Sequence, residues 1–340
     1  MIKTHKDGFS IRPVVNNIQS PRYKLAKFLT KKLQHVLELT NEYTAPNSSH
    51  AAKVLTKLVI NQTHRMATFD IKDLYGNILI TEIIQITANK LEMKRIDPET
   101  RRELILLLDL VRNQNYFQFR DNFYKPEKGV AMGSPISGLV AEISLQHFEG
   151  LIIKHLLEDG RIKYYTRYVD DIMMIYDSSK ILQEDILSKM NMFHHNLIFK
   201  LTPEQDNAVS FLDLIITKKC SKLNVNIYRK PTTTGMTLHA TSNHPPEHEM
   251  VAYRALVHRM HNLPLSETHR KAELETIKYT AKRNVSSTRW INRINNKIIN
   301  RNKEKQEKPR DVCSTDNPKW VAFIFHNPPN PECNKHLQKL

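Results

Sequence analysis

The sequence predicts an α+β fold in which helices pack against an antiparallel sheet. Short apolar runs bounded by turn residues alternate with longer segments of helical periodicity. In chain order these read as a strand, two helices, a hairpin, a helix, a hairpin, a helix and further strands. Beyond Pro231 only helical segments follow. Strands joined in pairs by tight turns are typical of antiparallel sheets, so this order favours the α+β class.

Composition restricts the class of protein and its partners. The chain has 340 residues, enough for one large domain or two to three smaller ones, and 40% of them are hydrophobic. Its 51 Lys and Arg outnumber 35 Asp and Glu, which gives a net charge of +16 and favours nucleic acid over an anionic membrane as partner. No apolar run has the roughly 20 residues of a membrane span, and the N-terminus has no signal-peptide pattern. We therefore expect an intracellular protein without a membrane partner.

Cysteine and glycine usage argue against two kinds of site. Cys220, Cys313 and Cys333 are scattered and form no CxxC pair, so we expect reduced thiols and no structural zinc. Only 8 glycines are present, and neither GxxxxGK(S/T) nor GxGxxG occurs. A P-loop or Rossmann nucleotide site is therefore not expected.

The first segment is basic. A strand is expected to end near Val15, and residues 21–37 have the spacing of an amphipathic helix. Before this helix, Lys3, Lys6 and Arg12 form either a phosphate-binding edge or a solvated basic loop.

A possible ligand-binding carboxylate follows the next strand. The elements expected here are a helix over 51–62, a strand over 66–69, helices over 81–95 and 98–112, and a hairpin over 116–124 that turns at 120–122. The strand ends at Asp70, and a carboxylate at a strand exit points out of the sheet edge, where ligands tend to bind. Asp73 and Tyr75 follow closely, and Asp97 is the expected N-cap of the second of these helices.

The stretch from Gly129 to Pro135 (GVAMGSP) is the most glycine-dense in the chain and precedes a long helix expected over 136–159. Two glycines and a serine before a helix N-terminus let the backbone approach a flat or anionic ligand closely. The alternative is a simple connection between hairpin and helix.

Residues 164–177 (YYTRYVDDIMMIYD) predict a buried hairpin with Asp170 and Asp171 at its bend. Adjacent carboxylates repel each other unless a cation lies between them, and hard oxygen ligands suit Mg²⁺. Asp70 can meet this pair on an adjacent strand, and carboxylates that bridge two ions about 3.5–4 Å apart are the arrangement of two-metal phosphoryl transfer. The alternative is a surface hairpin with a solvated turn.

The C-terminal half becomes helical and basic. The elements expected here are a helix over 180–195, strands over 197–201, 209–217 and 223–228, and helices over 247–261, 266–282 and 288–305. From Arg270 to Arg310 thirteen Lys or Arg stand against four acids, so this segment carries nine of the sixteen net charges. We expect a helical domain that binds nucleic acid, the alternative being solvated helix faces.

Four blocks occur in a recognisable order: Phe69 to Tyr75 (FDIKDLY), Gly129 to Pro135, Tyr168 to Asp171 (YVDD) and Phe211 to Asp213 (FLD). As a set they resemble the palm motifs and the primer grip of the reverse transcriptases. A more particular resemblance, over roughly residues 3–260, is to the Penelope-like retroelements. It rests on HK at 5–6, RPVV at 12–15, SP at 20–21, AMGSP at 131–135, YRKPT at 228–232 and SNHP at 242–245.

The resemblance implies a right-hand polymerase with partial fingers, an antiparallel-sheet palm and a helical thumb. The expected boundaries are fingers 1–62, palm 63–217, thumb 218–310, and a linker or truncated C-terminal extension over 311–340. The implied activity is an RNA-directed DNA polymerase with two Mg²⁺ ions, for which Mn²⁺ can substitute. Its implied partners are an RNA template, a DNA or RNA primer and dNTPs, and an element that copies into chromosomes is expected to act in the nucleus.

Residue roles are implied as well. Asp70, Asp170 and Asp171 are the expected catalytic residues and, with the carbonyl of Ile71, the expected metal ligands. Tyr75 would exclude a 2′-hydroxyl by shape. The other residues expected to bind the nucleotide are Arg12, Met132, Gly133, Ser134 and Lys200, of which Lys200 is a candidate general acid. Those expected to bind nucleic acid are Lys6, Phe211, Leu212, Arg229 and Lys230, together with Arg289, Arg293 and Lys297 of the basic helices.

The sequence also departs from the family pattern. Met132 stands where many reverse transcriptases have glutamine, although the Penelope-like pattern accepts methionine, and Asp73 replaces a serine of the palm block. The chain starts in the middle of the fingers and has no trace of the GIY-YIG nuclease of many such elements, so we expect a truncated copy. Two rival functions follow: an inactive nucleic-acid-binding protein with a polymerase fold, and an RNA-templated RNA polymerase. The retained aspartates argue against the first and Tyr75 against the second.

Overall fold

The computed structural model describes residues 14–113, 116–125 and 128–307 of the chain. The chain divides into two units, residues 1–295 and residues 296–340, and the division falls inside the last described helix. Most of the expected first strand, the basic residues Lys3, Lys6 and Arg12, and the extension over 311–340 lie outside the described residues.

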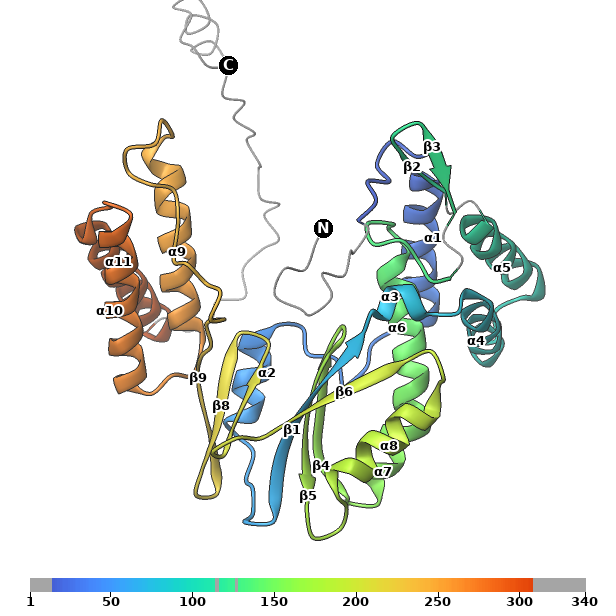
Figure 1. Cartoon of the computed structure of the whole chain (residues 1–340), viewed down its shortest axis with the longest axis horizontal. Helices are drawn as coiled ribbons and strands as arrows, with labels where there is room; N and C mark the ends of the chain where they lie inside the picture. The colour runs from blue at the N-terminus through green and yellow to red at the C-terminus, as the bar shows by residue number, and fades with distance from the viewer. Residues whose placement is uncertain (1–13, 114–115, 126–127, 308–340) are drawn as a thin grey trace, which may run out of the picture. The chain divides into compact units, whose positions relative to one another are not determined.

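A four-stranded antiparallel sheet forms the centre of the first unit (Figure 1). Its strands occur in the order β4 (Ile162–Tyr168), β5 (Asp171–Asp177), β1 (His64–Lys72) and β6 (Ile198–Pro203). All three neighbouring pairs are antiparallel, which confirms the predicted fold class. Side chains of a strand alternate between two faces, and in β1 Ala67, Phe69 and Ile71 are buried on the face that meets the helices.

Helices cover this face of the sheet and complete the main core. The contributing helices are α1 (Arg22–Leu37), α4 (Ile80–Met93), α5 (Pro98–Asn113), α6 (Ser137–Phe148) and α8 (Gln183–Phe193). Phe148 of α6 lies between Phe193 and Phe199, with ring centroids 5.0 Å away in both cases. Burying a side chain of this kind contributes about 1.5–3 kcal/mol, so these helices are fixed against the sheet mainly by apolar packing.

Local sequence signals placed most helix starts correctly. The Asp97 Oδ1 atom accepts the backbone N–H of Thr100 at 2.8 Å at the start of α5, as predicted. Asn47 caps α2 (Ser48–Leu55) by accepting the N–H of His50 at 2.9 Å, but this helix ends at Leu55 rather than at residue 62.

The long helix expected over 136–159 is interrupted. After α6, a π-helical turn covers Glu149–Ile153, and α7 (Lys154–Glu158) completes the segment before Gly160 at a φ of +63°. A π-turn carries one extra residue, which the 3.6-residue apolar period does not reveal.

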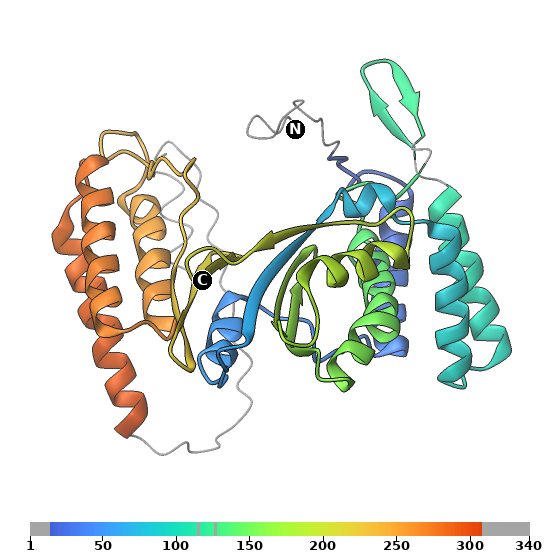
Figure 2. The ribbon, with the colours of Figure 1, turned by 60° about the horizontal axis from the view of Figure 1, so that its bottom comes forward.

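Between α5 and α6 the predicted hairpin is present. It consists of β2 (Phe117–Phe119) and β3 (Asn122–Tyr124), which pair antiparallel and project as a separate two-stranded ribbon (Figure 2). The short helix α3 (Leu74–Asn77) directly follows β1.

A second sheet corrects one strand prediction. The run expected as a single strand over 209–217 forms a hairpin of β7 (Ala208–Phe211) and β8 (Leu214–Lys219), and β8 pairs further with β9 (Lys222–Ile227). The chain reverses because Leu212 adopts a left-handed φ of +56°, which an apolar run does not announce. The palm boundary expected after residue 217 therefore falls inside β8.

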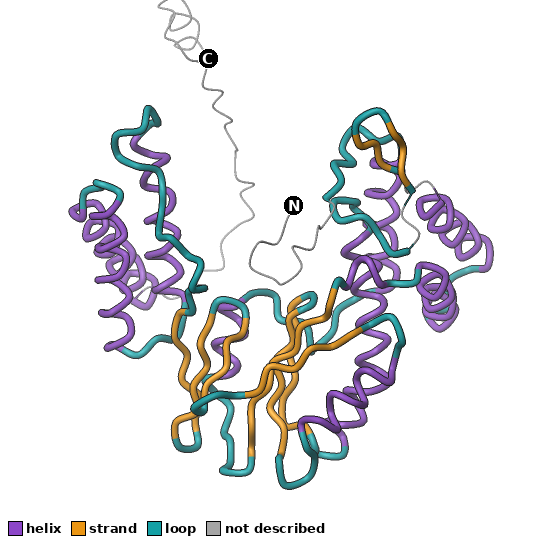
Figure 3. Tube along the Cα trace, in the orientation of Figure 1, coloured by secondary structure: helices purple, strands orange, loops and turns teal. Residues whose placement is uncertain are grey.

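Three helices follow the second sheet, as predicted (Figure 3). They are α9 (Pro246–Asn262), α10 (Glu267–Arg283) and α11 (Thr288–Glu307). The Ser266 hydroxyl caps α10 by accepting the N–H of His269 at 3.2 Å. Among the described residues, no helix is both long and apolar enough to span a membrane.

Candidate active site

Four side chains form a row across the central sheet, on the face opposite the helices. The strand register pairs Tyr168 with Asp171, Asp171 with Asp70, and Asp70 with Lys200. Cross-strand partners project to the same face with Cβ atoms about 4.5–5.5 Å apart, so two carboxylates and one ammonium lie side by side. The predicted meeting of Asp70 with the hairpin is therefore observed. However, β1 does not end at Asp70 but continues to Lys72, so this carboxylate lies on a paired strand position and not at a strand exit.

The turn between β4 and β5 places the third carboxylate. Only Val169 and Asp170 connect the two strands, and Val169 has a φ of +54°. A β-branched residue in this left-handed region is strained by about 1–2 kcal/mol, and such strain is concentrated at functional sites. The strained turn sets Asp170 directly beside Asp171 at the end of the row.

Charge repulsion within this group is visible in the titration of Asp171. Its pKa is raised to about 6, first by burial and then by the negative charges of Asp170 and Asp70, while Lys230 partly offsets the shift. Lys230 follows β9, so the segment that leads to the last helices brings a cation to the carboxylates.

The carboxylates fit a hard divalent cation, although they form no closed cage. Among the residues that the structure describes, no three His, Cys, Asp or Glu side chains are gathered so as to hold a metal ion. Mg²⁺ is commonly bound by one or two carboxylates together with substrate phosphates rather than by a cage of protein ligands alone. The donor chemistry and the mutual repulsion at Asp171 both suit such an ion. The side chain of Ile71 is buried on the core face, so only its backbone is available to a ligand.

The glycine-rich stretch packs against the first motif. Val130 donates its backbone N–H to the carbonyl of Tyr75 at 2.8 Å. Gly129 has a φ of +73°, and a Cβ atom there would lie 2.4 Å from the same carbonyl oxygen. This glycine therefore permits a close approach of two backbone segments of the protein.

The second glycine of this stretch has a similar function. Gly133 has a φ of +104°, and a Cβ atom there would lie 2.2 Å from the carbonyl oxygen of Val15. Val15 donates its N–H to Met132 at 2.8 Å, and Ser134 donates to Ala131 at 3.2 Å. The predicted close backbone approach is present at Gly133, but the partner that the structure shows is the chain itself and not a ligand.

Several residues expected to bind nucleic acid have other surroundings. Phe211 is buried in the core, so only Leu212 and the backbone of this turn are accessible. The guanidinium of Arg229 pairs with Glu273 of α10 through both Nη atoms, so it holds that helix and is not available to a phosphate. Lys6 and Arg12 lie outside the described residues.

The cations of the last helices are accessible. Arg289, Arg293 and Lys297 are exposed on α11 and follow each other at intervals of four residues, which places them along one face of that helix. Within the described part of the chain, none of the three forms an ion pair with an acid.

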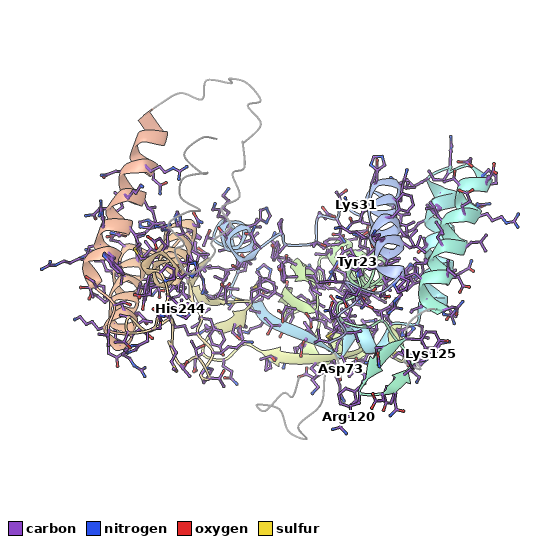
Figure 4. The ribbon with its side chains drawn as sticks, turned by 90° about the horizontal axis from the view of Figure 1, so that it is seen from above. Tyr23, Lys31, Asp73, Arg120, Lys125 and His244 are labelled. Atoms are coloured by element: carbon purple, nitrogen blue, oxygen red, sulfur yellow. The ribbon has the colours of Figure 1, made fainter. Side chains whose placement is uncertain are left out.

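Residues that sequence analysis missed tie the motifs together. Arg259 of α9 donates to the Asp213 carboxylate and to the Asp213 carbonyl, both at 2.7 Å, which fixes α9 to the β7–β8 turn. The only sequence signal was an arginine near the apolar positions of a helix. Figure 4, seen from above, shows Asp73 on the same side of the unit as Arg120 and Lys125 of the β2–β3 hairpin.

An antiparallel sheet with carboxylates on two central strands and helical segments before and after it defines a polymerase of the right-hand type. The family profile described as "Reverse transcriptase (RNA-dependent DNA polymerase)" matches residues 4–222, and the chain belongs to this family. A second profile, "Animal helix-turn-helix domain", matches residues 236–296, which contain α9, α10 and the start of α11. The search of curated proteins gave no match.

Solved structures share the fold at low sequence identity. Telomerase from Candida albicans, in complex with a fragment of telomeric RNA, superimposes with a TM-score of 0.53 at 15% identity over 78% of this chain. The RNA-dependent RNA polymerase of a human picobirnavirus gives a TM-score of 0.49 at 11% identity over 76% of this chain and 49% of its own. The chain spans about half the length, 47%, of the Candida albicans telomerase chain.

Proposed function

We propose that this chain is an RNA-directed DNA polymerase that adds dNTPs to the 3′-hydroxyl of a DNA or RNA primer on an RNA template. The observation that carries the proposal is the row in which Asp70 and Asp171 are cross-strand partners, with Asp170 beside them. Membership of the reverse transcriptase family supports the same activity. No other cluster of functional side chains among the described residues has comparable support from both sequence and structure.

The three aspartates would hold two Mg²⁺ ions, for which Mn²⁺ would substitute, with Asp70 and Asp170 as the main ligands. When bound, such ions activate the primer hydroxyl and stabilise the charge of the leaving pyrophosphate. The protein's own contribution is to fix the carboxylates on two paired strands, so little reorganisation is needed at the time of reaction. The exposed Lys200 beside Asp70 would donate a hydrogen bond or a proton at the pyrophosphate side.

The nucleotide pocket would be formed where the first two motifs meet. Tyr75 would lie under the incoming sugar, and Met132, Gly133 and Ser134 would border the nascent base pair. The hydrogen bond from Val130 to the Tyr75 carbonyl supports this assignment, because it ties the two motifs to each other.

The helical region after β9 would be the thumb, and the palm would end with β9 rather than at residue 217. Residues before 63 would belong to the fingers. A hybrid duplex is recognised through its backbone and shape, and the exposed cations of α11 suit that task. The Penelope-like blocks further favour a retroelement that acts in the nucleus, which a fluorescent fusion would test.

The direct test is primer extension on poly(rA)/oligo(dT) with Mg²⁺ and dTTP. The wild type should extend the primer, and Asp170→Ala should abolish extension while it leaves binding of the duplex intact. The control is Asp177→Ala, which removes a carboxylate at the other end of the same strand and should retain extension. Wild-type binding without any extension would identify the chain as an inactive nucleic-acid-binding protein instead.

A second test separates this activity from RNA-templated RNA synthesis. Tyr75→Val should admit rNTPs because it removes the ring that would exclude a 2′-hydroxyl, and the ratio of kcat/KM for dTTP and UTP measures the effect. Incorporation of UTP by the wild type at the rate of dTTP would refute the role of Tyr75 and favour an RNA polymerase.

A further inference from the structure

The side chain of Arg167 is the largest that is fully buried in the described part of the chain, and it lies three residues before Asp170. It is a cross-strand partner of Ile172, whose side chain belongs to the core, so Arg167 projects to the face opposite the carboxylate row. A buried guanidinium is strongly destabilising unless acids and hydrogen bonds satisfy it, which makes its partners informative.

Every nitrogen of this guanidinium is engaged. Nε and Nη2 donate to Glu149 at 2.6 and 3.3 Å, Nη1 and Nη2 donate to Glu142 at 3.1 and 3.0 Å, and Nη2 also donates to the Thr44 hydroxyl at 3.2 Å. In addition, Nη1 donates to the carbonyl of Val169 at 3.4 Å. We name Arg167, Glu142, Glu149 and Thr44 the arginine cluster.

The acids of this cluster are themselves held in place. Glu149 is fully buried, accepts the Tyr165 hydroxyl at 3.2 Å and accepts the side-chain amide of Asn41. Glu142 accepts the Gln146 amide at 2.9 Å. The pKa of Glu142 is lowered, because the hydrogen bonds and charge of Arg167 outweigh the opposing effect of burial.

Three separate elements meet at the arginine cluster. Glu149 begins the π-turn between α6 and α7, a local structure frequent at functional sites. Arg167 exchanges backbone hydrogen bonds with Tyr43 and Ala45, both at 2.8 Å, so the segment between α1 and α2 runs beside β4. Helix, loop and strand are therefore locked together directly before the strained turn.

We propose that Arg167 is a positioning residue: from beneath the sheet it holds the Val169 carbonyl, and thereby keeps the turn in the conformation that sets Asp170 beside Asp171. This inference rests on the proposed function for its meaning but not for its test. Without the guanidinium, nothing offsets the strain of a valine at a φ of +54°, and the turn relaxes. Relaxation moves Asp170, and a displacement of about 1 Å at a reacting group can cost on the order of 100-fold in rate.

The test uses Arg167→Lys, which keeps the charge but loses the fork that spans both acids and the carbonyl. Two quantities are measured on the full chain: the affinity for Mn²⁺ by electron paramagnetic resonance without nucleic acid, and the single-turnover rate of primer extension. Both should fall about 10- to 100-fold, since outer partners of metal ligands have effects of that size. The affinity for the template–primer duplex, set by phosphate contacts elsewhere, should change by less than about twofold.

A second substitution distinguishes positioning from general stabilisation. Val169→Gly removes the strain of the left-handed turn, so in the Arg167→Lys background it should restore most of the Mn²⁺ affinity and of the extension rate. The matched control is Cys220→Gly. Cys220 has a φ of +55° at the exposed β8–β9 turn, so its replacement relieves the same kind of strain away from the carboxylates. It should raise the thermal stability without restoring either quantity.

The outcomes are distinct. Unchanged Mn²⁺ affinity in Arg167→Lys, or equal rescue by the two glycine substitutions, overturns the positioning role. If wild type never extends a primer but Mn²⁺ binding responds as described, the positioning role holds and the proposed polymerase activity fails. Should Arg167→Lys not fold, Glu149→Gln, which keeps shape and volume, takes its place with the same expected directions and the same rescue.

Discussion

Replacing Asp171 by asparagine should stabilise the protein while it abolishes catalysis. The carboxylate of Asp171 lies beside Asp70 and Asp170 and is partly buried, so its charge opposes the folded state. Asparagine has the same shape but no charge, and therefore removes the repulsion without creating a cavity. A functional residue that destabilises its own fold is expected where an ion or substrate later supplies the missing charge.

The magnitude follows from the titration. Burial and the neighbouring carboxylates raise the pKa of Asp171 from 3.8 to about 6. At about 1.4 kcal/mol per pKa unit this corresponds to about 3 kcal/mol at neutral pH. Because Asp171 is only partly buried, solvent screening reduces the expected gain to about 1–2 kcal/mol, or about 2–6 °C in Tm.

The sign gives the pH dependence of this effect. The folded-state pKa lies above the unfolded value, so ionisation of Asp171 costs stability. That cost is absent below about pH 4, grows between about pH 4 and pH 6, and is constant above. Asp171→Asn should therefore raise Tm at pH 8 and leave it unchanged at pH 4, as measured by calorimetry without divalent ions.

Asp177, at the other end of the same strand, is the matched control. Hydrogen bonds from Ser179 lower the pKa of Asp177, so its charge favours the folded state and is lost as the pH falls through the folded-state pKa. Asp177→Asn should accordingly lower Tm at pH 8. A Tm of Asp171→Asn at or below that of the wild type at pH 8 would refute the account of repulsion between the three aspartates.

Two further predictions concern the thumb and the glycine-rich stretch. Neutralising Arg289, Arg293 and Lys297 together should weaken duplex binding for all sequences, and flatten the salt dependence by a slope of about 0.7–0.9 per phosphate contact, without a change in the single-nucleotide rate. Filter binding across a salt series measures this, and an unchanged slope would leave these residues as a solvated face. Gly133→Ala should destabilise the chain by about 1–3 kcal/mol in denaturant unfolding, because its Cβ would lie 2.2 Å from the Val15 oxygen.

Controls for both predictions exist in the chain. Lys53, Lys57 and Lys219 are exposed outside the last helices, and their joint neutralisation makes the same charge change but should leave the duplex affinity nearly unaltered. Gly138, on an exposed position of α6, has open space around the added Cβ, so Gly138→Ala should stabilise by about 0.5–1 kcal/mol. Equal effects of Gly133→Ala and Gly138→Ala would contradict the role assigned to the Val15 contact.

The elements with strong local signals were predictable from the sequence. The helices α1, α5, α10 and α11 carry apolar residues at helical spacing and start near the predicted residues. The β4–β5 hairpin is encoded by two apolar runs with aspartates between them, and the basic excess of the last helices is a property of composition. These features depend on backbone preference and on the alternation of apolar residues within a few turns, which any single segment contains.

The active-site row depended on pairing between distant segments. The sequence predicted that Asp70 and Asp171 lie on neighbouring strands, but only the structure placed β1 between β5 and β6 and so brought Lys200 beside Asp70. Choice of partner and register is set by how whole strands pack against the core, and a one-residue shift would turn every side chain to the other face.

Tertiary structure alone decided the role of the buried and paired charges. In the sequence Arg167 and Arg229 are two more cations in a basic chain, whereas in the fold one is enclosed by Glu142 and Glu149 and the other is paired with Glu273. Leu212 and Val169 likewise adopt left-handed conformations that their side chains disfavour. Such residues are held by contacts between segments far apart in the chain, because only the packed protein offsets the cost of a buried charge or a strained backbone.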